Sequence, residues 1–194
     1  VYLWGVQVEK QSYATSYIPT SGAIETRAAE ELSKSGLSDY INSYEGVLYL
    51  EFDYLYETTA DSDTDANRDI FVLGSSSDIN DGISIDNYRG QFRVFVQGDL
   101  MTTQDIGDNT TGSAQPNTRY KLAVKYKSGD SKAYLNGSLL GSVGTGDVNF
   151  TTDLDSIFFS FNSLARPFKN QKKVYDLRVY TTALTDEELT QLTS

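Results

Sequence analysis

Histidine and cysteine are both absent from the 194 residues of this chain. Their absence excludes Ser-His-Asp and Cys-His nucleophile systems, disulfide bonds and the usual tetrahedral zinc sites. Any acid–base chemistry would therefore depend on carboxylates, tyrosine or lysine. Proline is scarce too, with three residues, whereas the chain holds 15 Gly, 14 Tyr and 9 Phe. That composition is typical of strands joined by turns.

Positive charge is also in short supply. The chain has 16 Lys and Arg against 27 Asp and Glu, which gives a formal net charge of −11. Such a surface repels phosphate backbones and anionic lipids, so we expect no nucleic-acid partner and no affinity for anionic membranes. No run approaches the roughly 20 apolar residues that a membrane-spanning helix requires, so we expect no membrane insertion.

Period-two alternation predicts most of the strands. After Gly46, one face of a strand takes the apolar set Leu48, Leu50, Phe52, Tyr54 and Tyr56. Another strand, 91–96, places Phe92, Val94 and Val96 on one face. Turn signals separate these segments at short intervals, and Asn136-Gly137 predicts a type I′ hairpin. The pattern predicts an all-β antiparallel sandwich rather than βαβ units.

One short helix is predicted at the C-terminus. Thr185 as N-cap and Glu188 three residues later make a capping box, and Leu184 and Leu189 have the spacing of a hydrophobic staple. We expect this helix to dock on the sandwich through Leu189 and Leu192.

The chain is predicted to have two parts. Residues 1–45 hold a strand over 1–9 and a polar connector, and residues 46–194 form the sandwich. The sequence opens on VYLWGVQVE, which looks like the interior of a domain. We therefore expect a piece of a longer protein, with residues 1–45 closing a preceding module.

Two segments resemble known families. The segment WGVQVEKQSYATSYIPTSGAIETRAAE resembles a junction between modules of bacteriophage fibre and appendage proteins. RYKLAVKYKSGDSKAYLNGSLLGSV and KVYDLRVYTTALTDEELTQL are similar to the end of laminin-G-like, concanavalin A-like domains. That resemblance implies a two-sheet jelly-roll sandwich of the lectin/glucanase type, in which the outer face of one sheet often holds sugars. Fold alone does not fix function, so the site is argued from its residues.

A carbohydrate site is predicted on the non-core faces of two strands. Alternation places Tyr49, Glu51 and Asp53 opposite the apolar set of the first strand, and Arg93 and Phe95 opposite that of the second. An aromatic ring packs on the apolar C–H face of a pyranose, and charged groups orient its hydroxyls. The alternative is cross-strand pairing, in which Glu51 or Asp53 simply binds Arg93 on a solvated sheet.

The same strand raises the alternative of a glycoside hydrolase. Laminarinase-type enzymes carry E-x-D-x-E or E-x-D-x-x-E, and LEFDYLYE supplies Glu51 and Asp53 but displaces the third carboxylate to Glu57. A retaining mechanism needs two carboxyl groups about 5–5.5 Å apart. Glu51 and Glu57 would lie on the order of 20 Å apart along a strand. We therefore expect no catalytic residues and no enzyme activity.

An acidic loop predicts calcium as a cofactor. Oxygen ligands recur at every second position of this loop, at Asp61, Asp63, Asp65, Asn67 and Asp69. Calcium takes six to eight oxygen ligands, several of them carboxylates. The loop is not an EF-hand, and the alternative is that its charges are simply solvated.

These observations together predict a non-catalytic glycan-binding module. By resemblance it belongs to a phage fibre or spike, is located on the virion or outside the cell, and recognises a host-surface polysaccharide. Its other partners would be virion proteins. A homo-oligomer would build affinity from weakly binding copies. The alternatives are a structural spacer of the virion and an atypical laminarinase-type hydrolase.

Overall fold

The computed structural model describes residues 17, 19, 22, 32–54, 67–78, 81–88, 91–97, 117–142, 148, 150–159, 168–169 and 172–194. The chain divides into two compact units, Val1–Glu30 and Glu31–Ser194. The sandwich therefore begins before the boundary predicted at residue 46. Ser33 and Lys34 pair with a strand of the sandwich, and Ile41 packs in its core. The strand predicted over 1–9 lies outside the described residues.

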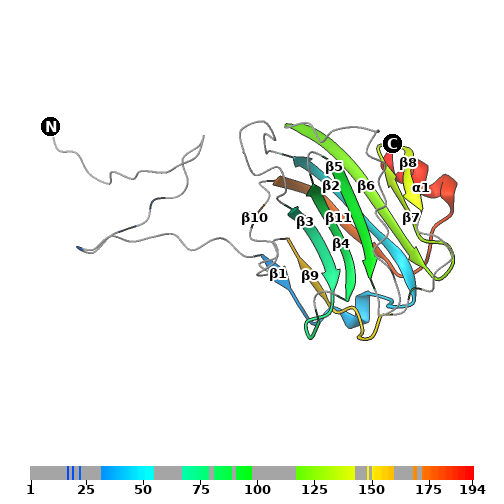
Figure 1. Ribbon diagram of the computed structural model, residues 1–194, viewed down its shortest axis with the longest axis horizontal. Coiled ribbons are helices and arrows are strands. Elements are labelled where there is room, and N and C mark those ends of the chain that lie inside the picture. The colour runs from blue at the N-terminus through cyan, green and yellow to red at the C-terminus, as the bar shows by residue number, and fades with distance from the viewer. Residues whose placement is uncertain are drawn as a thin grey trace. The chain divides into compact units, whose positions relative to one another are not determined.

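Two sheets form the second unit (Figure 1). The six-stranded sheet has the order β1-β9-β3-β4-β5, with β10 paired to β3, and the five-stranded sheet has the order β11-β2-β6-β7-β8. All pairings are antiparallel except that of β10 with β3. The elements are β1 (Ser33–Lys34), η1 (Ser38–Tyr40), β2 (Glu45–Tyr54), β3 (Asn67–Gly74), β4 (Gly82–Tyr88), β5 (Gln91–Gln97), β6 (Thr118–Lys127), β7 (Lys132–Leu135), β8 (Ser138–Ser142), β9 (Ser156–Phe158), β10 (Phe168–Lys169), β11 (Lys172–Tyr180) and α1 (Asp186–Thr193). The predicted all-β antiparallel sandwich with one short C-terminal helix is confirmed.

The core lies between the sheets and contains the predicted apolar faces. Leu48, Leu50 and Phe52 of β2 and Phe92, Val94 and Val96 of β5 all belong to it. Aromatic rings from both sheets meet there, with the Phe52 and Phe92 centroids 5.7 Å apart in an edge-to-face arrangement. Burying these side chains is the main force that holds the sheets together. The inward register predicted for both strands is therefore confirmed for these six residues, whereas Tyr56 and the side chain of Tyr54 lie outside the described part of the chain.

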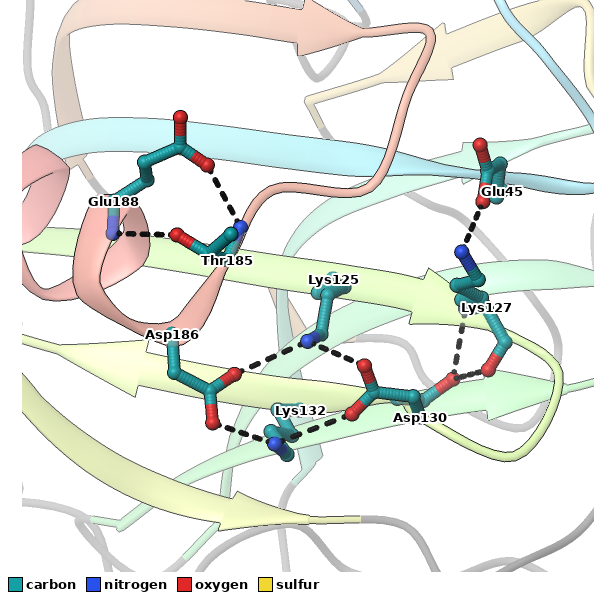
Figure 2. Close-up of polar contacts among 9 residues, drawn as sticks. Glu45, Lys125, Lys127, Asp130, Lys132, Thr185, Asp186 and Glu188 are labelled. Carbon is teal, nitrogen blue, oxygen red and sulfur yellow. Dashed lines mark hydrogen bonds and ion pairs between the residues drawn. The ribbon is translucent and has the colours of Figure 1, made fainter.

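The predicted hairpin and helix cap are both present. Asn136 and Gly137 join β7 to β8 with φ angles of 48° and 78°, which are the left-handed conformations that a type I′ turn needs. The Thr185 side chain accepts a hydrogen bond from the Glu188 amide, and the Glu188 carboxylate accepts one from the Thr185 amide (Figure 2). Within the described residues, no helix has the length and apolar character needed to cross a bilayer.

Apolar contacts fix α1 to the outer face of the five-stranded sheet, as predicted. Leu189 is fully buried there, and Leu184 and Leu192 pack around it. The apolar cluster beneath contains Val47, Tyr49, Ala123 and Tyr134. The helix therefore covers part of a sheet face that would otherwise expose apolar side chains.

A network of four charged groups reinforces this docking (Figure 2). The Lys125 ammonium lies 2.8 Å from Asp130 and 3.1 Å from Asp186, the first residue of α1. Lys132 bridges the same two carboxylates at 3.2 and 2.6 Å. The Lys125 side chain is only 3% exposed, so its charge depends on these partners. A hydrogen bond from Lys132 lowers the pKa of Asp186, and one from Lys125 lowers that of Asp130.

The first prediction is that acid weakens the docking of α1. Because the pKa of Asp186 is lowered from 3.8 in the folded state, its contribution is present above that value and is lost as the pH falls through the lower folded-state pKa. We expect Asp186→Asn to reduce the free energy of unfolding by about 1 kcal/mol near neutral pH. The difference from the parent should shrink as the pH falls below 3.8 and vanish once Asp186 is protonated in the folded state as well. Urea unfolding across a pH series measures this difference in the free energy of unfolding, with Asp39→Asn on η1 as the control. An unchanged pH profile for Asp186→Asn would contradict it.

Candidate functional site

The five residues predicted to bind a glycan do not form one site. Tyr49, Glu51 and Asp53 lie on β2 in the five-stranded sheet, whereas Arg93 and Phe95 lie on β5 in the six-stranded sheet. All five point away from the core, as alternation predicts, but their faces are on opposite sides of the sandwich. The prediction of a single site formed by all five residues is therefore wrong.

On the six-stranded sheet, Arg93 is held by a neighbouring strand. Its Nε and Nη2 donate to the two carboxylate oxygens of Asp86 at 2.8 and 2.6 Å, and Asp86 on β4 is its cross-strand partner. The guanidinium carbon lies 5.1 Å from the centroid of the Phe95 ring. Phe95 is only 5% exposed and Asp86 is fully buried. The cross-strand alternative thus holds for Arg93, with Asp86 in place of Glu51 or Asp53, and Phe95 offers a ligand almost no surface.

On the five-stranded sheet, Tyr49 is also covered. It is 3% exposed because it belongs to the apolar cluster beneath α1. Alternation correctly placed the ring outside the main core, but the helix closes that half of the face. Among the described residues of this face, only those in the half beyond α1, toward Asp53, combine an exposed ring with charged groups.

That open half carries a compact group that we call the Arg119 patch: Glu51, Asp53, Arg119 and Tyr175. Arg119 of β6 donates from Nε to Asp53 at 3.2 Å and from Nη1 to Glu51 at 3.4 Å. The Tyr175 hydroxyl donates to the other Asp53 oxygen at 2.5 Å. The guanidinium carbon of Arg119 lies 3.5 Å from the centroid of the Tyr175 ring. The ring is thus held at its hydroxyl and on one side, and Tyr175 remains 47% exposed.

A β-bulge places Tyr175 in the patch. The register between β11 and β2 shifts between Val174 and Asp176, so that Tyr175 is the extra residue. Val174 and Leu177 both pack against the core, although they are three residues apart. A regular strand would turn two such residues to opposite faces, whereas a bulge lets both point inward. The side chains of Tyr175 and Asp176, which lie between Val174 and Leu177 in the sequence, then point to the outer side of the sheet.

The electrostatics of the patch keep Asp53 ionised. The hydrogen bond from Tyr175 lowers the pKa of Asp53, and the hydrogen bond and charge of Arg119 lower it further. Asp53 in turn raises the pKa of Arg119. A general acid must hold its proton near neutral pH, so Asp53 is poorly suited to protonate a leaving group. An ionised carboxylate beside a guanidinium and a fixed ring is instead suited to accept and orient hydroxyl groups.

Neither Arg119 nor Tyr175 was predicted from the sequence as a residue of the site. Arg119 sits directly opposite Asp53 in the pairing of β2 with β6, and that pairing needs a topology that one sequence does not give. For Tyr175 the sequence does contain a signal of its outward position, which is the three-residue interval between Val174 and Leu177 in KKVYDLRVY. An interval of three within a period-two pattern is typical of a bulge.

The calcium prediction lies almost wholly outside the described residues. Asp61, Asp63 and Asp65 are outside them, and the backbone positions of Asn67 and Asp69 open β3. Calcium binding by this loop stays a prediction. Among the described residues, no group of three or more acidic side chains is placed to hold a metal ion.

No protein-family model matches the chain, and no curated protein matches its sequence. Solved structures do match its fold. The binding domain of botulinum neurotoxin serotype G has a TM-score of 0.61 and 13% identity, and the match covers 82% of this chain and 39% of that one. A heptameric SAP-like pentraxin from Limulus polyphemus has a TM-score of 0.57 and 14% identity, covering 77% and 70%. A Trypanosoma rangeli sialidase has a TM-score of 0.56 and 16% identity, covering 77% and 22%.

These matches show the fold, which is the concanavalin A-like β-sandwich that the resemblance implied. The chain spans about a fifth of the sialidase and two fifths of the neurotoxin domain. Nothing in the matches assigns the chain to a phage protein.

Proposed function

We propose that this chain is a non-catalytic glycan-binding module and that the Arg119 patch is its binding surface. The observation that carries the proposal is Tyr175, a half-exposed ring held between the Arg119 guanidinium and the Asp53 carboxylate. A held ring loses little conformational freedom when a sugar packs on it, and preorganisation of this kind favours binding. The fold is compatible with this role, and one of the similar structures is itself a binding domain.

Two features favour binding over hydrolysis. Both carboxylates of the patch contact Arg119, and the lowered pKa of Asp53 removes it as a general acid. The third carboxylate of the laminarinase-type motif is displaced to Glu57, outside the described residues. A hydrolase of atypical arrangement is therefore the weaker alternative, and a spacer without a ligand is the stronger one.

The wider role follows from the N-terminal resemblance. We propose that the module belongs to an extracellular appendage of a phage virion, binds a host-surface polysaccharide and contacts other virion proteins. Repetition of the module on a homo-oligomer would raise its avidity above the affinity of one weak site.

The second prediction tests the patch directly. Tyr175→Ala is expected to weaken glycan binding at least about tenfold, because the variant removes both the stacking ring and the hydroxyl that orients Asp53. The far-ultraviolet circular dichroism and Tm should stay close to those of the parent, since Tyr175 lies on the surface. An array of immobilised glycans identifies a ligand, and isothermal titration then measures both proteins.

The matched control is Tyr44→Ala. Tyr44 is 82% exposed and lies outside the Arg119 patch, so its loss should leave binding unchanged. Equal binding by the parent and Tyr175→Ala would exclude the patch as the binding surface. Binding of no glycan would favour the spacer.

A further inference from the structure

We infer that the ligand of the Arg119 patch is an uncharged pyranoside, bound by its hydroxyls and one C–H face, rather than a sialylated, uronate or sulfated glycan. The inference rests on the proposed function and specifies the chemical class of its ligand. It follows from how the charges of this face are already paired.

Among the described residues, this face carries two guanidinium groups, and each already lies against a carboxylate. The charge of Arg119 is matched by Glu51 and Asp53, at 3.4 and 3.2 Å. Arg178 lies 2.5 Å from Asp176, and its guanidinium carbon is 5.5 Å from the centroid of the Tyr49 ring. A site for an acidic sugar uses an Arg whose charge is available to the ligand carboxylate. Here the charge of each guanidinium is already matched by a carboxylate, so an anionic ligand would gain little net attraction from either of them.

The carboxylates themselves lie side by side on the neighbouring strands β2 and β11. Glu51 is the cross-strand partner of Asp176 and is two residues from Asp53 on the same strand. A ligand anion placed against them would be repelled by about 1 to 4 kcal/mol for each unit charge at 4 Å, depending on the local dielectric. Hydroxyl groups, in contrast, donate readily to carboxylates. Glu51 and Asp53 keep 20% and 18% of their side-chain surface exposed, so their oxygens can be reached.

Two lysines among the described residues, Lys121 and Lys173, lie beside the Arg119 patch, and they do not reverse this conclusion. Lys121 bonds the Ser194 carbonyl oxygen, and Lys173 sits opposite Asp53 on β11, the outermost strand of the sheet. Together with Arg119 and Arg178 they give four positive charges against the three carboxylates Glu51, Asp53 and Asp176, an excess of one. An excess of one charge, in a chain of net charge −11, creates little field that would concentrate anions.

The remaining chemistry of the patch suits a neutral sugar. The exposed part of the Tyr175 ring provides a surface for the C–H face of a pyranose. Arg119 uses Nε and Nη1 for its carboxylate partners and is 49% exposed, so its other N–H groups can donate to hydroxyl oxygens. A carboxylate acceptor next to a guanidinium donor matches two adjacent hydroxyls of one ring.

The third prediction uses matched probes. N-acetyllactosamine, its sialylated form and its sulfated form are titrated against the whole chain, together with neutral maltohexaose and the uronate polymer alginate. We expect binding of neutral members only, with affinity that changes by less than about twofold between low and high salt. Glu51→Gln should weaken the binding of the neutral ligand several-fold, because it removes a carboxylate acceptor. The same variant should increase the affinity for the sialylated or sulfated form.

Each outcome decides the inference. Preference for the sialylated, sulfated or uronate probe, weakened by salt and by Tyr175→Ala, would overturn the neutral class and leave glycan binding by the patch standing. Binding of no probe would overturn the proposed function as well. Neutral binding that is unaffected by Tyr175→Ala would place the ligand elsewhere and so overturn the assignment of the patch.

Discussion

Replacing Phe52 by alanine is expected to reduce the free energy of unfolding by about 3–5 kcal/mol, the largest effect of any single change considered for this protein. Phe52 is fully buried. Its ring contacts Phe92 of the opposite sheet edge-to-face at 5.7 Å, and Tyr120 of the neighbouring strand at 6.0 Å. Truncation leaves a cavity between the sheets and removes both ring contacts. A domain of this size is stabilised by about 5–15 kcal/mol in total, so the loss is a large share.

Urea unfolding followed by circular dichroism measures this change. The midpoint should fall with little change in the denaturant slope, because the variant exposes nearly the same surface on unfolding. Tyr40→Ala is the matched control, since Tyr40 is an exposed aromatic residue whose loss should change stability by less than about 0.5 kcal/mol. Equal stability of the two variants would mean that Phe52 does not hold the sheets together.

The strand register could be predicted from the sequence because its errors are costly. A slip of one residue in β2 would turn Leu48, Leu50 and Phe52 to the outside and bring Glu51 and Asp53 into the core. The pattern therefore specifies one register. The hairpin at Asn136-Gly137 and the capping box were predictable for a similar reason, since each depends on a few adjacent residues.

The membership of strands in sheets could not be predicted in the same way. Alternation shows which side chains of a strand point inward and which point outward, and the pattern is equally clear in β2 and β5. It does not say which of the two sheets a strand joins, and that choice separated Tyr49, Glu51 and Asp53 from Arg93 and Phe95. Pairing across the sheet, which brought Arg119 to Asp53, is set by the whole topology.

The boundary of the sandwich was missed because its first elements are short. The two-residue strand Ser33–Lys34 has no alternation to detect, and it is held by its partner β9. The single apolar side chain of Ile41 then enters the core from a polar stretch. Local sequence carries too little pattern in such segments to reveal tertiary contacts.

Replacing Leu189 by alanine is expected to reduce the free energy of unfolding by about 2–4 kcal/mol. Leu189 is fully buried at the centre of the contact between α1 and the five-stranded sheet. An eight-residue helix is too short to be stable alone, so it depends on this contact and on its cap. Loss of the leucine should therefore loosen α1 before the rest of the sandwich, even though the network around Lys125 remains.

Amide hydrogen exchange distinguishes this local effect from a general loss of stability. In Leu189→Ala, the amides of residues 189–193 should exchange much faster, whereas those of β2 and β6 in the core should follow the global stability alone. Leu192→Ala is the matched control, because Leu192 is only partly buried in the same cluster, so its replacement should reduce the free energy of unfolding by less. Uniform acceleration across the sandwich would instead mean that α1 and the sheets unfold as one unit. In that case the helix would be an integral part of the cooperative core, and Tyr49 beneath it would be as inaccessible to a ligand as Phe52.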